Sequence, residues 1–183
     1  MANIFSKHYY QTNYQFYQKY HSNIYNKLVH IFCIPGIVYS LLGLLMNLES
    51  HWAFKNNTKN KKLLSLLLYG FYMAYYYTIA PNHIFRKTLM FYSSIYIASD
   101  MTYNNISNSV KPFLFIQIVS WALQLLSHRF IEKNSPAFKD GFVQSFLTAP
   151  VFVVDEISKF VPKLKFWPIF LALPIAKIAF EGW

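Results

Sequence analysis

The sequence is poor in the residues on which many catalytic and structural sites depend. Its 183 residues include one cysteine, Cys33, which excludes an internal disulfide framework and a zinc site built from several cysteines. Five glycines provide no glycine-rich phosphate loop, dinucleotide-binding fingerprint or nucleophile elbow. Charged residues make up 13% of the chain, against about 25% in an average soluble domain. So few charges could hardly cover a water-facing surface, which disfavours an ordinary soluble protein.

Hydrophobic residues make up 55% of the chain and aromatic residues 20%. This composition excludes a disordered, collagen-like or coiled-coil protein. The net charge is +10. In so apolar a chain, we interpret the lysines as residues that flank membrane segments beside anionic headgroups. A nucleic-acid-binding role is disfavoured, because the lysines do not form a stripe with exposed aromatic residues.

Four apolar segments are candidates to span a membrane. They are Leu28–Met46, Leu63–Ala80, Thr88–Ser99 and Phe113–Ile131. About 20 apolar residues cross the hydrocarbon core, so the first two fit well, the fourth fits adequately and the third is short. No signal peptide is predicted, because the first apolar run begins only at Leu28. We expect Met1 to Tyr20, which mixes tyrosine with polar residues, to form an interfacial helix, with a soluble amphipathic helix as the alternative.

Two later apolar runs, Phe142–Val154 and Phe166–Phe180, are too short and too broken by proline to span, so we expect them to be re-entrant or interfacial. The predicted fold is an all-α membrane bundle forming one domain, 1–183. Residues 1–27 form an interfacial segment, 28–131 the spans and 132–183 an interfacial C-terminal region. Twelve of the 17 lysines and arginines then lie on the side of the two termini, which favours a cytosolic or matrix location for both ends.

Three of the six histidines, His21, His30 and His128, come to the same membrane face in this topology. His21 and His30 would lie on opposite faces of one straight helix, so they can share a centre only if the chain bends near Ser22–Asn23. Imidazole with carboxylate or water suits non-haem iron, zinc or copper, and an open site of this kind suits oxygen activation or metal-assisted hydrolysis. The alternative, an interfacial histidine without a metal, is our interpretation of His8, His51 and His83.

Polar side chains share helix faces with two of these histidines. Glu132 lies four residues after His128, and Gln124 lies four residues before it, so all three fall on one helix face. A carboxylate one turn from a histidine can bind the same metal or orient the imidazole. Asn26 shares a face with His30 in the same way. As an alternative, Glu132 forms a salt bridge with Lys133 or Arg129.

Two blocks of the sequence resemble a known family. The first block, from Phe16 to Gly36, carries Tyr20, His21, Asn26, His30 and Pro35. The second, from Ser120 to Glu156, carries Trp121, Gln124, His128, Phe130, Glu132, Lys133, Pro136, Ala137, Gln144, Ala149, Pro150 and Glu156. In these blocks the chain resembles the fungal and bacterial family of small membrane 2-hydroxy fatty acid dioxygenases. It departs from the family at Ser127, where the family has glycine, and at Asn134–Ser135, where the family has a basic stretch.

The resemblance implies an iron(II) enzyme of the endoplasmic reticulum membrane. Such an enzyme would use O2 to shorten a 2-hydroxy fatty acid by one carbon, in the α-oxidation that belongs to phytosphingosine breakdown. The acyl chain can stay among the membrane lipids while its carboxylate and hydroxyl reach the metal. The expected iron ligands are His21, His30 and His128, with Glu132 as a fourth ligand or an acceptor that orients an imidazole. Lys133 or Arg129 would pair with the substrate carboxylate, and Asn26 and Gln124 are further candidates for substrate contacts.

Two other functions remain open from the sequence. The chain could be a non-catalytic accessory subunit of a large membrane complex, for example in the mitochondrial inner membrane, that keeps the family fold. The aromatic tail Phe166–Trp183 would suit docking against partner subunits or lipid. Alternatively, the chain could bind or shape lipid without redox chemistry, in which case replacement of the histidines would leave its function intact.

Overall fold

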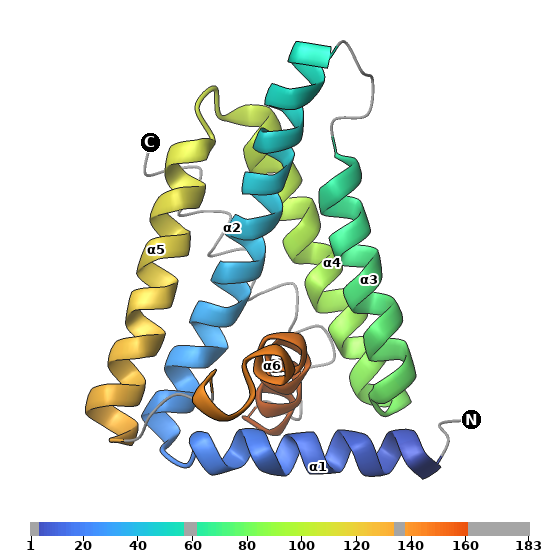
Figure 1. Cartoon of the computed structure of the whole chain (residues 1–183), viewed down its shortest axis with the longest axis vertical. Helices are drawn as coiled ribbons and strands as arrows, with labels where there is room; N and C mark the ends of the chain where they lie inside the picture. The colour runs from blue at the N-terminus through green and yellow to red at the C-terminus, as the bar shows by residue number, and fades with distance from the viewer. Residues whose placement is uncertain (1–3, 57–61, 134–137, 161–183) are drawn as a thin grey trace.

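The computed structural model describes residues 4–56, 62–133 and 138–160, which form helices joined by short turns and contain no β-strand. The elements are α1 (Ile4–Tyr20), α2 (Ile24–Asn56), α3 (Leu63–Ile79), α4 (Asn82–Asn105), α5 (Val110–Ser127), the π-helical segment η1 (His128–Glu132) and α6 (Phe138–Phe160). Helices α2 to α5 run side by side along the long axis, while α1 crosses one end and α6 lies at the same end, seen nearly end-on (Figure 1). The all-α prediction is confirmed for the described residues.

The four predicted spans coincide with helices α2, α3, α4 and α5, the last of which continues into η1. Two stretches, Ile24–Trp52 and Val110–Glu132, are long and apolar enough to cross a membrane. Helix α3 is apolar but shorter, with 17 residues. Helix α4 has 24 residues, twice the predicted third segment, and its length comes from polar residues at both ends. The predicted tail segment Phe166–Phe180 lies outside the described residues.

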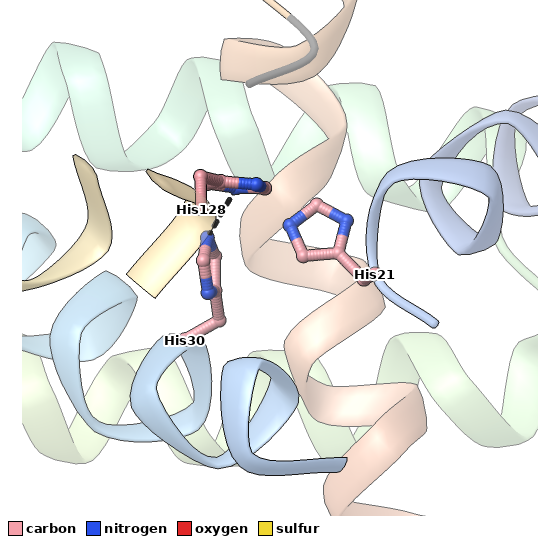
Figure 2. A group of neighbouring side chains, drawn as sticks. All are labelled: His21, His30 and His128. Atoms are coloured by element: carbon pink, nitrogen blue, oxygen red, sulfur yellow. Dashed lines mark hydrogen bonds between the residues drawn. The ribbon is translucent and has the colours of Figure 1, made fainter. Parts of the chain in front are cut away.

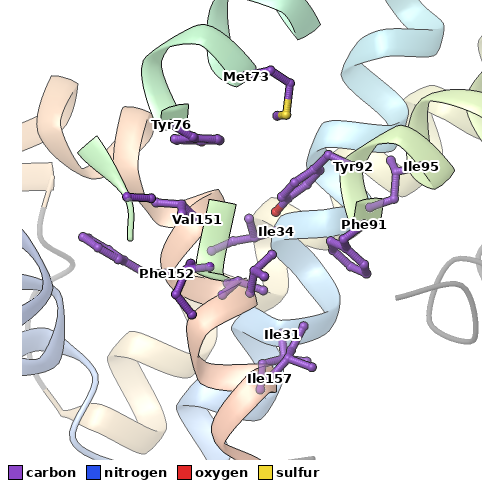
Figure 3. Packing of buried hydrophobic residues seen from close by; sticks show 14 of the residues in the cluster. Ile31, Ile34, Met73, Tyr76, Phe91, Tyr92, Ile95, Val151, Phe152 and Ile157 are labelled. Atoms are coloured by element: carbon purple, nitrogen blue, oxygen red, sulfur yellow. The ribbon is translucent and has the colours of Figure 1, made fainter. Parts of the chain in front are cut away.

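Helix α2 is the centre of the bundle, since it packs against α3, α4, α5 and α6. The hydrophobic core lies at the end of the bundle where α6 meets these helices (Figure 3). The run Val151–Val154 of α6 is fully buried against residues such as Ile34 of α2 and Tyr92 of α4. The hydroxyls of Tyr76 and Tyr92 donate to the α6 carbonyls of Leu147 and Pro150, at 3.0 and 3.2 Å. The apolar run of α6 therefore packs in the protein interior.

Gly43 allows α2 and α5 to approach closely. A Cβ atom at this position would lie 2.1 Å from the ring of Phe113, which is completely buried. We expect Gly43→Ala to lower the free energy of unfolding by about 1–3 kcal/mol, because the core has no room for the methyl group. Gly70 is the matched control: a Cβ there meets no atom within 4 Å, so Gly70→Ala should be neutral or stabilising by up to about 1 kcal/mol. Equal unfolding midpoints for the two variants in detergent would contradict this account.

Candidate metal centre

The junction between α1 and α2 brings two of the candidate histidines to one place. Helix α1 ends at Tyr20 and α2 begins at Ile24, so the chain bends at the residues where the sequence analysis requires it. His21 follows the last residue of α1, and His30 lies in the second turn of α2. The third, His128, is the first residue of η1 at the end of α5. Residues separated by more than a hundred positions therefore meet at one end of the bundle.

His21, His30 and His128 form a compact histidine cluster (Figure 2). Each is buried, with at most 6% of its surface exposed. Their ring centroids lie 4.5 to 4.9 Å apart, and the rings meet edge to face. Each residue offers a nitrogen that lies within 4.8 Å of those of the other two. The cluster is the arrangement predicted from the sequence, and it could hold a metal ion.

Backbone contacts fix the tautomers of two members of the cluster. The Nδ1 atoms of His21 and His30 lie 2.8 and 2.9 Å from the carbonyl oxygens of Tyr17 and Asn26. A carbonyl can only accept, so each Nδ1 carries the proton and each Nε2 has a lone pair that a metal could use. Burial lowers the pKa of His21 to about 3, because desolvation disfavours the charged imidazolium. His21 is therefore neutral at neutral pH, as a metal ligand must be.

The three imidazoles could hold one divalent metal ion. The Nε2 atoms of His30 and His128 are 3.2 Å apart. Two imidazole nitrogens bound to one ion at about 2.1 Å, at tetrahedral or octahedral angles, would be about 3.0–3.4 Å apart. Within the described residues, the buried Nε2 of His21 has no hydrogen-bond partner, which an ion would provide. Three neutral imidazoles suit iron, zinc or copper and leave positions open for other ligands.

The Glu132 carboxylate contacts the α1–α2 junction. It accepts hydrogen bonds from the backbone N–H groups of Ser22 (2.7 Å) and Asn23 (3.1 Å), from the Ser22 hydroxyl (2.5 Å) and from Nδ2 of Asn26 (3.1 Å). It thus satisfies N–H groups at the start of α2, where a negative charge is favourable. The intervening π-helical turn is wider than an α-turn, so a spacing of four residues no longer stacks Glu132 on His128. Glu132 forms no ion pair with Arg129 or Lys133.

Asn26 joins α2 to the end of α5. Its Oδ1 accepts a hydrogen bond from the Ser127 hydroxyl at 2.6 Å, while its Nδ2 donates to Glu132. Its backbone carbonyl holds His30. Asn26 therefore fixes one histidine and clamps the segment that carries another, and its side chain is occupied by protein partners. The Ser127 hydroxyl thus supplies one of these contacts.

A cavity opens from the histidine cluster into the bundle. It has about 1140 Å³ of empty space, counting the space at its open side, and its walls are almost entirely apolar. All three histidines and Gln124 line it, together with residues such as Leu42 and Leu68 farther along the bundle. The remaining sequence candidates lie elsewhere. Arg129, Lys133, His8, His51 and His83 are exposed and do not line the cavity.

Comparison with known proteins identifies the family of the chain. The profile of the family described as 2-hydroxy-palmitic acid dioxygenase Mpo1-like matches residues 7–161, most of the chain. The chain belongs to the Mpo1-like family. It is 28% identical over 153 residues to the 2-hydroxy-palmitic acid dioxygenase MPO1 of Saccharomyces cerevisiae, and the match covers 82% of each protein. No solved structure gives a significant match. The resemblance seen in the sequence is thus confirmed at the level of the family.

This Mpo1-like chain also contains a buried ionic cluster that the histidine pattern did not reveal. Glu156 of α6 is buried, accepts a hydrogen bond from the Tyr14 hydroxyl and pairs with Lys27 at 3.3 Å. The neighbouring Asp155 accepts a hydrogen bond from Tyr10 at 3.1 Å. These contacts connect α6 to α1 and α2 beside the histidine cluster. A signal was present in the sequence, since Glu156 is among the residues on which the sequence analysis based the family resemblance.

Proposed function

We propose that this Mpo1-like chain is an iron(II)-dependent dioxygenase that shortens 2-hydroxy fatty acids by one carbon. The observation that carries the proposal is a cluster of three buried histidines at the wall of a long apolar cavity. The family supports the substrate class, since its description names 2-hydroxy-palmitic acid, a long-chain 2-hydroxy fatty acid. The nitrogen ligands support a metal of the iron, zinc or copper type, and oxygen chemistry favours iron among them.

His21, His30 and His128 would hold the iron, which when bound would supply the activation of O2. The protein contributes position and environment. The carbonyls of Tyr17 and Asn26 orient two imidazoles, and burial keeps water from the reacting end of the substrate. The overall reaction balances without a further reductant: R–CHOH–COOH and O2 give R–COOH, CO2 and H2O.

The dimensions of the cavity support a long acyl chain. On α2 its lining extends from His30 to Leu42, which at about 1.5 Å per residue corresponds to about 18 Å. An extended chain advances about 1.2 Å per bond, so this length would hold about 15 bonds. The apolar walls would hold the hydrocarbon by the hydrophobic effect while the carboxylate and hydroxyl face the histidines.

We further propose that α2 to α5 all span the membrane within one domain, residues 1–183, with α1 and α6 near one interface. The support is the many large apolar side chains exposed on the outer surface of the bundle, since a large exposed apolar surface marks an interaction or membrane site. Exposed apolar residues lie on all four helices, and examples are Phe32, Leu67, Phe71, Ile97, Phe115 and Ile118. A lipid substrate could then reach the cavity from the bilayer. By family resemblance we propose the endoplasmic reticulum as the compartment.

The test is turnover by the detergent-purified full-length protein loaded anaerobically with iron(II). On addition of O2 we expect loss of 2-hydroxyhexadecanoic acid and formation of the acid with one carbon fewer, and label at C1 should appear as CO2. Zinc loading is the matched control and should support no turnover. A protein that retains no metal and copurifies in fixed ratio with other chains would contradict the proposal and favour the accessory-subunit function.

A further inference from the structure

The cavity contains most of the unpartnered buried polar atoms of the described residues. Among the described residues, six buried side-chain nitrogen or oxygen atoms have no hydrogen-bond partner. Five of these atoms belong to residues that line the cavity. Two of the five are imidazole nitrogens of His21 and His128. The other three are the hydroxyl of Tyr17, Nε2 of Gln124 and Oγ of Ser145, which we call the donor set. Buried polar groups are nearly always satisfied, so a group of such atoms in one cavity indicates a polar ligand.

Tyr17 of the donor set lies beside the histidine cluster, Gln124 lies one helical turn before His128, and Ser145 lines the same cavity. Tyr17 precedes His21 by one helical turn, and their rings stack with centroids 4.0 Å apart. Gln124 precedes His128 by four residues at the end of α5. Ser145 comes from α6, so three separate helices contribute one donor each. Tyr17 and Gln124 are each only 6% exposed.

The chemistry of the donor set matches a carboxylate with a neighbouring hydroxyl. An amide N–H and two O–H groups donate hydrogen bonds, and a carboxylate is the strong acceptor that lacks donors of its own. A buried arginine or lysine would carry a large desolvation penalty, whereas the penalty for burying a neutral donor is much smaller. A divalent metal held by the histidines would balance the negative charge. Arg129 and Lys133 are exposed, away from this part of the cavity.

We propose that Tyr17, Gln124 and Ser145 bind the polar head of the 2-hydroxy acid and give the site its preference for a carboxylate over an alcohol. This proposal rests on the proposed function for the identity of the ligand. It assigns substrate recognition to neutral donors and leaves the surface cations outside the site.

The stability of the free protein provides a first test. If the Tyr17 and Ser145 hydroxyls serve a ligand, Tyr17→Phe and Ser145→Ala remove groups that have no partner in the free protein. The thermal unfolding midpoint without ligand should then stay the same or rise. A clear fall in the midpoint of both variants would assign the hydroxyls to the structure and overturn the proposal.

The decisive experiment measures binding under anaerobic conditions, where no turnover occurs. The metal-loaded full-length protein is titrated with 2-hydroxyhexadecanoic acid and with 1,2-hexadecanediol, which replaces the carboxylate by an alcohol, against a fluorescent fatty acid. Wild type should prefer the acid. Tyr17→Phe, Gln124→Leu and Ser145→Ala should each weaken acid binding by about tenfold or more, since each removes a hydrogen bond to a charged group, and should change diol binding little. The exposed Tyr25→Phe is the matched control.

Three outcomes would overturn the donor set: no preference for the acid in wild type, unchanged acid affinity in all three variants, or loss of the preference in Arg129→Gln/Lys133→Gln instead. Metal content, measured for every variant, separates loss of recognition from loss of the metal. The two proposals also fail separately. Acid preference that depends on the donor set, without turnover in O2, supports the donor set and contradicts the dioxygenase. Turnover with an unchanged KM in the three variants supports the dioxygenase and contradicts the role of the donor set.

Discussion

Alanine at His21, His30 or His128 should leave the purified protein without bound metal. Each imidazole supplies one of three nitrogens, and the described residues place no further histidine, cysteine or carboxylate in the cluster. Removing an outer-shell partner of a metal ligand typically costs 10–100-fold in metal affinity, so loss of a ligand itself should cost about 100-fold or more. Metal analysis after dialysis should fall from about one iron per chain to background, and O2-dependent turnover should disappear with it.

The controls for this experiment are His83→Ala and His51→Ala. Both residues are exposed and lie outside the cluster, so their replacement should leave metal content and turnover unchanged. Folding of each variant is monitored separately from its metal content. Loss of the unpartnered Nε2 of His21 should not by itself unfold the protein. Retention of one metal per chain in all three cluster variants would remove the histidines from the site. Retained function without metal would favour a lipid-binding protein.

The local parts of the site could be predicted from the sequence. The bend at Ser22–Asn23 was predictable because His21 and His30 cannot face one point from a straight helix. The approach of His128 followed from the same topology, since an antiparallel arrangement of segments returns the end of α5 to the face where α2 begins. Both inferences need only helical periodicity and the order of apolar segments. The structure places all three histidines together as expected.

Hydropathy underestimated α4 because it scores composition and does not see packing. Predicted as Thr88–Ser99, the helix extends from Asn82 to Asn105. Three of its polar residues, Thr88, Ser99 and Thr102, are buried inside the bundle. The Ser99 hydroxyl donates to the Tyr39 carbonyl at 3.0 Å, and the Thr102 hydroxyl is 2.6 Å from that of Tyr39. A buried polar residue with a partner fits a helix core as well as an apolar one does. The cavity was equally hidden, since it is formed by side chains from six helices.

The position of Glu132 was the feature most dependent on tertiary structure. Its partners Ser22 and Asn23 lie more than a hundred residues earlier. A local rule of four residues assigned it to the face of His128, and a single π-helical turn changes that geometry. Such turns are rare and often occur at functional sites, but no residue pattern in the sequence predicts this one. The contact could be found only once α5 and the α1–α2 junction were placed in space.

Glu132→Ala should weaken metal binding by about 10–100-fold and lower the free energy of unfolding by about 2–3 kcal/mol. The loss of stability follows because two backbone N–H groups at the start of α2 and the amide of Asn26 lose a charged acceptor. The loss of metal affinity follows because this junction positions His21. Glu49→Ala is the matched control. Glu49 accepts from the backbone N–H of Leu64 at 2.6 Å at the start of α3, so its loss should reduce stability without changing metal affinity.

A double-mutant cycle with Ser22→Ala separates a positioning role from direct coordination. The Ser22 hydroxyl donates to Glu132 at 2.5 Å, so the two residues should be coupled if Glu132 acts through the junction. The effect of Glu132→Ala on metal affinity should then be smaller in the Ser22→Ala background, because part of the contact is already lost. A carboxylate bound directly to the metal would give the same loss in both backgrounds and would change the spectrum of the bound metal in Glu132→Gln. Metal affinity equal to wild type in Glu132→Ala would contradict both roles.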